Sequence, residues 1–299
     1  MKRFKTMSIC VATAGALTVA ALMPIAAFGQ SDGRVFRDCD ICPEMVVVPG
    51  GTFLMGSSEA ERSWAIQAGS RADWLENEQP RRKVAIPRKL AVGKYEVTQA
   101  EWLAVMGTNP SFFKGATKPV EFVSWNDVQE FLNRLSRKAS KRYRLLTEAE
   151  WEYAARASTT TPFSTGNAIT PLQANFDGSY IYGGSVPGSA RNETIPVGSF
   201  APNAFGLHDM HGNVWEWTAD CYREKAYRLH STAAGNRDNS RRRCHRVLRG
   251  GAYYNAPMNL RSAKRYWFYP IYRADNIGFR VARDMPKTRL ATPKPNRRP

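Results

Sequence analysis

Residues 158–206 form a long stretch that shows no helical period and is rich in Gly, Ser, Thr, Pro and Asn. These residue types favour turns over regular elements. So long an irregular stretch is uncommon inside a compact domain unless a function or a bound ion holds it. Sustained heptads do not fit 22 Gly, 18 Pro and 8 Trp, so a coiled coil is excluded. We expect little regular structure from there until strands near 246–252 and 278–283.

Three segments ahead of this stretch begin with the same chemistry. In each, a Ser or Thr hydroxyl precedes an acid by three residues, which lets the two side chains bond the free backbone N–H groups of a first helical turn. The starts are Thr98–Glu101, Ser124–Asp127 and Thr147–Glu150. They predict helices over 98–106, 124–137 and 147–157.

The region before these helices contains short extended pieces. Met45–Gly56 predicts a strand, a glycine turn and a second strand. Residues 57–80 are charged, carry Trp64 and Trp74, and are expected to form a surface loop. Further short extended pieces are expected over 84–97.

The N-terminus has the layout of an export signal. Two lysines and an arginine in the first five residues precede an apolar run, Met7–Phe28, and Ala27 and Gly29 are small residues suited to cleavage before Gln30. An uncleaved signal anchor is the alternative, because the run is long. Cleavage would make the protein periplasmic or secreted, with no membrane span afterwards.

The sequence shows no internal repeat and no linker of domain size. The simplest division is a signal peptide at 1–29, a polar lead-in at 30–42, one domain at 43–284 and a basic, disordered tail at 285–299. The formal net charge is +17, which suits an anionic partner or a solvated basic surface. No nucleic-acid motif accompanies the charge, so we expect no nucleic-acid partner.

Export leaves four cysteines in the mature chain: Cys39, Cys42, Cys221 and Cys244. An even number in an oxidising compartment suggests two disulfides, and four cysteines allow three pairings. Cys39 with Cys42 would close a small loop, and Cys221 with Cys244 would join the ends of a basic loop. A thioredoxin-like pair and a four-thiolate zinc site are the functional alternatives.

Several phrases of the chain are too specific to be generic. They are Met45–Gly56, Gly93–Thr98, Pro119–Trp125, Arg144–Arg156, Phe205–Trp217, Arg246–Ala252 and Asn276–Arg283. In this order they resemble the formylglycine-generating enzyme family, also called the sulfatase-modifying factor family. The resemblance implies an α+β fold: a single compact, loop-rich domain, C-type lectin-like, with little secondary structure.

Enzymes of that family oxidise a cysteine of a client sulfatase to formylglycine with oxygen and copper. Two cysteines that follow the Arg-Gly-Gly motif bind the copper, and thiolates suit Cu(I). The corresponding positions here are Asn255 and Leu260, and residues 252–283 contain no cysteine. Copper is therefore not expected, and catalysis of any kind is uncertain.

The resemblance also implies calcium. In the family's second calcium site, Asp209 and Glu216 would supply carboxylates, and Gly212 and Val214 would supply carbonyl oxygens, which are the ligands that Ca²⁺ prefers. The alternative is that both acids only bond nearby backbone. A first site would begin at Asn175 and Phe176, but its later acidic ligand has no clear match.

A substrate groove is expected where the cysteines would have been. Its candidate residues are Asn255, Arg261, Arg265, Trp267 and Arg273. Arginines there would hold an acidic group of the ligand. The alternative is that they bond loop carbonyls, which a loop-rich fold needs in number.

Three functions compete. The first is an exported family member that acts on a peptide or peptide-like substrate, as a maturation factor or oxidase, without the copper-binding pair. The second is a non-catalytic, calcium-stabilised binding module for an envelope polymer or protein partner. The third is formylglycine synthesis by an unrecognised cysteine pair. Bound copper or oxygen consumption would favour the first or third, and polymer retention without turnover the second.

Overall fold

The fold is that of a computed structural model, which describes residues 33–229 and 244–286. The predicted signal peptide, the central part of the basic loop and nearly all of the predicted tail lie outside these residues. No helix in the described ranges is long and apolar enough to cross a membrane.

The three predicted helices are confirmed. They are α2 (Gln99–Met106), α3 (Trp125–Ala139) and α4 (Glu148–Arg156). Each begins with a complete capping box, in which the hydroxyl accepts from the third backbone N–H while the acid accepts from the cap residue's own N–H. The local signal was sufficient because both partners lie within four residues of each other.

The predicted loop over 57–80 is wrong. It contains α1 (Glu59–Gln67) and the 3₁₀ helix η1 (Ala72–Glu78). Ser58 caps α1 by accepting from Glu61 N–H, and Ala65 and Leu75 are buried. The segment was misread because its buried residues are few and its buried glutamates, Glu61 and Glu78, resemble a solvated surface until their partners are known.

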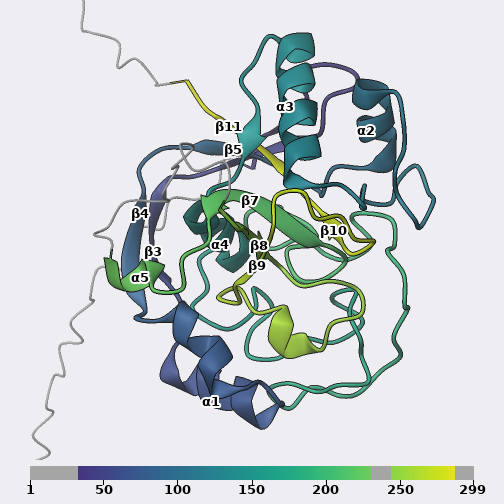
Figure 1. Cartoon of the computed structure of the whole chain (residues 1–299). Helices are drawn as coiled ribbons and strands as arrows, with labels where there is room; N and C mark the ends of the chain where they lie inside the picture. Colours follow the sequence, from purple (N-terminus) through teal and green to yellow (C-terminus); the bar gives the residue numbers. More distant parts are fainter. Residues whose placement is uncertain (1–32, 230–243, 287–299) are drawn as a thin grey trace, which may run out of the picture.

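The strands form three small sheets in the described residues (Figure 1). The first has the order β1 (Val35–Phe36), β2 (Met45–Val48), β5 (Leu90–Gly93), β11 (Val281–Asp284), β6 (Arg144–Leu145). The second has the order β10 (Ile277–Gly278), β7 (Trp215–Cys221), β8 (Arg246–Arg249), β9 (Tyr266–Phe268). The third pairs β3 (Gly51–Met55) with β4 (Arg82–Ile86).

The two predicted strands of Met45–Gly56 are confirmed, but they do not pair with each other. β2 joins the first sheet beside β5, whereas β3 pairs with β4. The strand β1 lies in the predicted lead-in and pairs with β2, so the sheet begins before residue 43. Short helices complete the described fold: α5 (Ala226–Leu229) and η2 (Pro257–Asn259).

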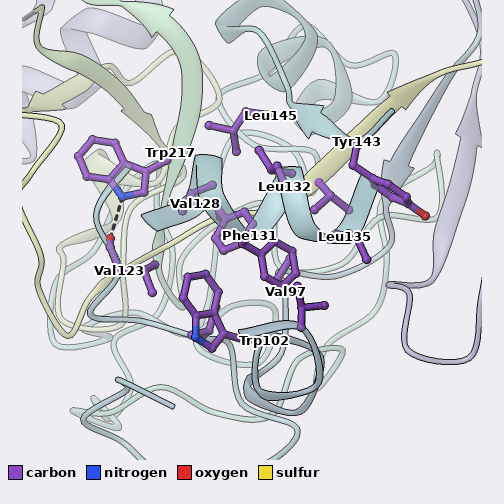
Figure 2. Packing of buried hydrophobic residues seen from close by; sticks show 14 of the residues in the cluster. Val97, Trp102, Val123, Val128, Phe131, Leu132, Leu135, Tyr143, Leu145 and Trp217 are labelled. Atoms are coloured by element: carbon purple, nitrogen blue, oxygen red, sulfur yellow. Dashed lines mark hydrogen bonds between the residues drawn. The ribbon is translucent and has the colours of Figure 1, made fainter. Parts of the chain in front are cut away.

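The main apolar core lies beneath α2 and α3 (Figure 2). The helical spacing of Val128, Phe131, Leu132 and Leu135 buries one face of α3. Trp102 of α2 stacks on Phe131 with ring centroids 5.2 Å apart. Trp215 and Trp217 of β7 belong to the same core.

The long irregular stretch is also confirmed: residues 158–214, all described, contain no helix or strand beyond isolated bridges. The strand β7 follows at once, earlier than the first strand predicted after the stretch. Side chains supply the hydrogen bonds that regular structure would have supplied. Arg156 donates to Thr161 O at 3.0 Å, and Asn203 Nδ2 donates to Ala154 O at 2.8 Å.

Both disulfides of the simplest pairing are present. Cys39 bonds to Cys42, and Cys221 bonds to Cys244. The first closes a turn in which Cys42 N–H donates to Cys39 O, and the second joins the end of β7 to the start of the segment that leads into β8. No cysteine in the described residues is therefore a free thiol.

Candidate functional site

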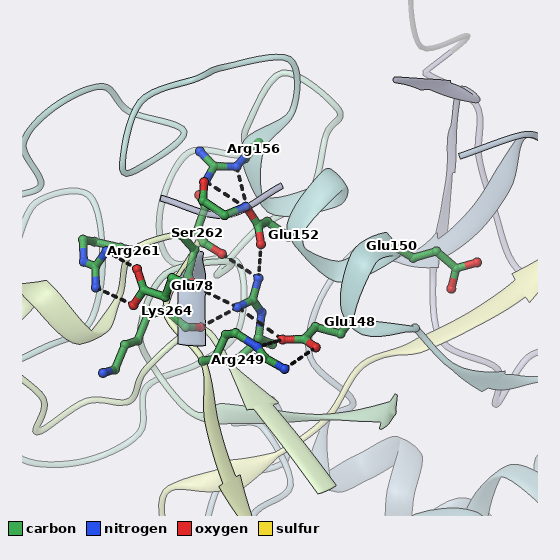
Figure 3. A network of polar contacts seen from close by, with 12 residues as sticks. Glu78, Glu148, Glu150, Glu152, Arg156, Arg249, Arg261, Ser262 and Lys264 are labelled. Atoms are coloured by element: carbon green, nitrogen blue, oxygen red, sulfur yellow. Dashed lines mark hydrogen bonds and ion pairs between the residues drawn. The ribbon is translucent and has the colours of Figure 1, made fainter. Parts of the chain in front are cut away.

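Two of the three arginines predicted for the groove bind buried glutamates, in line with the alternative that they are structural (Figure 3 shows Arg261). Arg261 is fully buried and donates to both carboxylate oxygens of Glu78 at 2.8 Å. Arg265 is 1% exposed and donates to both oxygens of Glu148, at 2.6 and 3.0 Å. These side chains hold the fold together, so their donors are not available to bind a ligand's acidic group.

The two arginines belong to a larger set that we call the ionic network. It consists of eight buried side chains: Glu61, Glu78, Glu148, Glu152, Arg156, Arg249, Arg261 and Arg265. Arg249 also donates to the carbonyls of Ser262, Ala263 and Lys264. The network therefore ties α4 to β8 and fixes the loop that follows the Arg-Gly-Gly motif.

Of the remaining groove candidates, Arg273 does not line the cavity that Asn255 and Trp267 share. Arg273 is half exposed and pairs with Asp127, at 2.7 and 2.8 Å, on the first turn of α3. Asn255 holds the Arg-Gly-Gly turn, because its Oδ1 accepts from Ala252 N–H at 2.9 Å. Leu260 is fully buried among apolar side chains. The two positions that hold cysteine in the family thus serve a turn and the core here.

A cavity of about 680 Å³ nevertheless lies where the groove was expected, and Asn255, Arg265 and Trp267 line it. Aromatic rings rather than arginines dominate its walls, so we call it the aromatic pocket. Its rings are Trp74, Trp215, Tyr222, Tyr254, Tyr266, Trp267, Phe268 and Tyr272. Asn77, Asn259, Asn276 and Lys264 add polar groups. Apolar walls with a few polar groups are the usual composition of a ligand site.

Elements distant in the sequence build this pocket. The helix η1 supplies Trp74, β7 supplies Trp215, and β9 supplies Tyr266. The rings support one another: Trp215 and Tyr266 stack with centroids 5.4 Å apart, and Phe268 and Tyr272 stack at 3.9 Å. Trp74, Tyr254, Tyr266 and Tyr272 keep between 39% and 53% of their surface exposed. Rigid rings that are partly open to solvent can cover an apolar ligand at low entropic cost.

The sequence did not predict that most of these residues line a site. It placed Trp74 in a surface loop and did not consider Tyr266, Tyr272 or Lys264. A signal was present, since the run Tyr266–Tyr272 holds five aromatic residues in seven positions. Such density in a loop indicates a binding surface more often than a core.

The predicted calcium turn, Asp209–Glu216, is buried beside Glu96. Burial raises the pKa of Asp209 to about 6 and that of Glu96 well above its ordinary range. Arg280 donates to both oxygens of Glu216, and Trp151 Nε1 donates to one of them at 2.8 Å.

The donor set at this turn fits calcium only in part. The buried Glu96 and Glu216 and the partly buried Asp209 lie near a single guanidinium, so the excess of negative charge favours a cation. Glu216, however, would have to be shared with Arg280. Within the described ranges, no three His, Cys, Asp or Glu side chains gather as metal ligands, so backbone carbonyls would have to complete a site.

The residues at the first predicted calcium position also fit calcium only in part. Asn175 is buried, and among the described residues its Oδ1 has no hydrogen-bond partner, so this oxygen could serve as a ligand. Its Nδ2 donates to Glu193 O and to Asn213 Oδ1. Phe176 packs in an apolar cluster with Phe163 and Tyr182. Asn175 therefore fits a ligand role, and the Phe176 side chain serves packing.

Two further cavities differ in character. One of about 520 Å³ lies at the C-terminal end of α3, and four cations line it: Arg137, Lys141, Arg142 and Arg144. The other, of about 230 Å³, contains Ser164 and His211. His211 Nε2 accepts from the Ser164 N–H at 3.0 Å, and burial lowers the pKa of His211 to about 4. A histidine so bonded braces a loop and is a poor base for Ser164.

Comparison with known proteins gives a consistent picture. The family model for the sulfatase-modifying factor enzyme 1-like domain matches residues 32–285. The formylglycine-generating enzyme of Mus musculus is 32% identical over 202 residues, which cover 63% of this chain and 50% of the mouse protein. The chaperone protein LppX of Paenibacillus barcinonensis is 29% identical over 245 residues, which cover 67% of this chain and 78% of that protein.

The match spans about half the length of the mouse enzyme. Among solved structures, that of PvdO from Pseudomonas aeruginosa is 35% identical, with a TM-score of 0.67, and the match covers 85% of this chain and 98% of that one. The likeness confirms the predicted fold class, an α+β, loop-rich domain of the C-type lectin-like type with little secondary structure.

Proposed function

Because the chain belongs to the sulfatase-modifying factor enzyme 1-like family, we propose that it is an exported protein that binds a peptide or peptide-like substrate in the aromatic pocket and takes part in its maturation. The observation that carries this proposal is the cavity of about 680 Å³ with partly exposed rings at the family's groove position. The two disulfides support export to an oxidising compartment, periplasmic or secreted.

The proposed activity does not include copper–thiolate oxidation. That chemistry needs two free thiolates, and the four cysteines of the described chain are joined in two disulfides. Asn255 and Leu260 serve a turn and the core. We expect no free thiol and no stoichiometric copper in the purified mature protein, checked by a thiol count under denaturing conditions and by elemental mass spectrometry. Stoichiometric copper together with two reactive thiols would contradict this expectation and would support copper-dependent oxidation.

The pocket is tested with short peptides that differ in aromatic content, using tryptophan fluorescence or calorimetry. We expect aromatic peptides to bind, and Tyr266→Ala to weaken binding about tenfold, because one lost ring contact removes about 1 kcal/mol beyond its buried area. Phe112→Ala is the matched control, since Phe112 is 68% exposed and lies outside the pocket lining. Equal losses in both variants would contradict a specific role for the pocket.

Calcium binding at Asp209–Glu216 is a second part of the proposal. It rests on the three carboxylates of Glu96, Asp209 and Glu216, which lie near the one guanidinium of Arg280. We expect chelator-treated protein to bind Ca²⁺ in calorimetry and to gain thermal stability, and Asp209→Asn to reduce both effects. An unchanged melting temperature in millimolar Ca²⁺, together with no calcium in the purified protein, would contradict calcium binding.

The cavity of about 520 Å³ at the C-terminal end of α3 favours a second candidate function. This function is that of a non-catalytic module that binds an anionic envelope polymer. Arg137, Lys141 and Arg142 are exposed there, and no carboxylate lines the cavity. Binding to an immobilised polyanion should weaken steeply with salt, and replacing all three residues with Gln should abolish it. Retention that survives the triple replacement would assign the polymer site to another surface.

A further inference from the structure

Lys264 lies beside the ionic network without joining it (Figure 3). The four glutamates of the network face four arginines, and Arg261 already occupies both oxygens of Glu78. Within the part of the chain that the structure describes, Lys264 Nζ has no hydrogen bond and no ion pair.

The Lys264 side chain forms part of the pocket wall. Only 5% of its surface is exposed, and Nζ lies 5.8 Å from the centroid of the Trp74 ring. Burial lowers the pKa of Lys264, which Glu78 opposes and the charge of Arg261 reinforces. An ammonium group with so little water and no carboxylate partner is costly for the fold. An anionic group in the pocket would supply the missing partner.

The charged side chains that line the pocket indicate which ligand charge the pocket can bind. Asp73 is bound by Arg71, at 2.8 and 3.0 Å, and Glu224 is exposed and forms no ion pair with Lys264. Arg265 is committed to Glu148 and to two backbone carbonyls. The wall therefore offers a single free positive charge, which matches a monoanionic carboxylate better than a phosphate dianion.

We infer that Lys264 anchors a carboxylate of the ligand in the aromatic pocket. This rests on the proposed function and narrows its substrate class to a peptide-like molecule with an aromatic or apolar part and a free carboxylate beside it. The rings cover the apolar part, and the ammonium donates to the carboxylate. The carboxylate belongs to a peptide C-terminus or to an acidic side chain, and the test separates these two sources.

The test uses three probes: N-acetyl-tyrosyl-tyrosine as the free acid, its C-terminal amide, and N-acetyl-aspartyl-tyrosyl-tyrosine amide. We expect the parent protein to bind at least one acid about tenfold more tightly than the neutral amide, as a charge-assisted hydrogen bond contributes about 1.5–3 kcal/mol. A preference for the first acid indicates C-terminal recognition, and a preference for the aspartyl probe indicates side-chain recognition.

Lys264→Met should abolish that preference, so that the acids and the neutral amide bind with similar affinity. Lys138→Met, on the exposed face of α3, is the control and should keep it. Because the buried ammonium is costly for the fold, the variant should melt at or above the temperature of the parent. Acids and amide bound equally by the parent would overturn the inference and leave the pocket function intact. Failure of all probes to bind would contradict the pocket function itself, and the inference with it.

Discussion

The apolar core beneath α3 and the ionic network beneath α4 are both fully buried, yet different forces hold them (Figures 2 and 3). Under α3, Phe131 and Leu135 pack against other apolar side chains. Beside α4, Glu152 accepts from Arg249, from Arg156 at 2.9 Å and from Gly56 N–H at 2.8 Å. The first region belongs to a regular helix, and the second anchors irregular loops.

The difference shows how a loop-rich chain satisfies its backbone. A helix bonds its own carbonyls, so its buried face can be purely apolar. Loops after β8 and after α4 expose carbonyls inside the protein, and arginines with five donors each can bond several of them at once. The carboxylates are needed because a buried guanidinium without an anion is very costly. The network therefore gives the buried loops the hydrogen-bond partners that a helix or a sheet provides for its own backbone.

The largest expected effect comes from removing one charge from the network. Glu152→Gln leaves Arg156 and Arg249 without their shared anion, so we expect the free energy of unfolding to fall by about 3–5 kcal/mol. Denaturant unfolding measures it. Glu130→Gln, which breaks the exposed pair with Arg134, should cost about 0.5 kcal/mol or less. Similar small losses in both variants would mean that the network does not hold the loops.

A cavity in the apolar core should cost somewhat less. Leu135 is fully buried, so Leu135→Ala is expected to lower the free energy of unfolding by about 3 kcal/mol, through lost transfer energy and an unfilled space. Leu103→Ala on α2 is the control, because 48% of Leu103 is exposed. The comparison would fail if both leucine variants unfolded at the same denaturant concentration.

Glu121 is a third case for this comparison, because it is a buried carboxylate that pairs with no arginine in the described part of the chain. Burial raises its pKa to about 7, its Oε1 accepts from Phe113 N–H at 2.8 Å, and its Oε2 has no hydrogen-bond partner in the described ranges. The fold favours the protonated acid. Its contribution to stability is therefore complete below the ordinary pKa of 4.5 and is lost as pH rises through about 7.

Glu121→Gln should remove this loss. Between pH 4.5 and 8.5 we expect the variant to gain about 2 kcal/mol relative to the parent, measured from unfolding curves at both pH values. Glu76→Gln, at an exposed position, should change the pH dependence little. A parent and variant with parallel pH profiles would place the titration of Glu121 near its ordinary pKa.

The local signals in the sequence were sufficient for the helices and for the family. The capping boxes at Thr98, Ser124 and Thr147 and the apolar spacing of α3 act within a few residues, so they can be recognised without a fold. The simplest cysteine pairing was also confirmed. The η1 segment was misread because its buried Glu78 becomes intelligible only beside Arg261, which lies 183 residues away.

The sequence by itself determined where α2, α3 and α4 begin, that residues 158–206 stay irregular, and that the family's copper ligands are absent at Asn255 and Leu260. Only the tertiary structure decided which arginines are structural and which side chains line the pocket. The physical reason is that an ion pair or an aromatic wall depends on residues brought together from distant segments. Arg261 turned inward to its carboxylates, while Lys264, three residues on, was left facing the pocket without one.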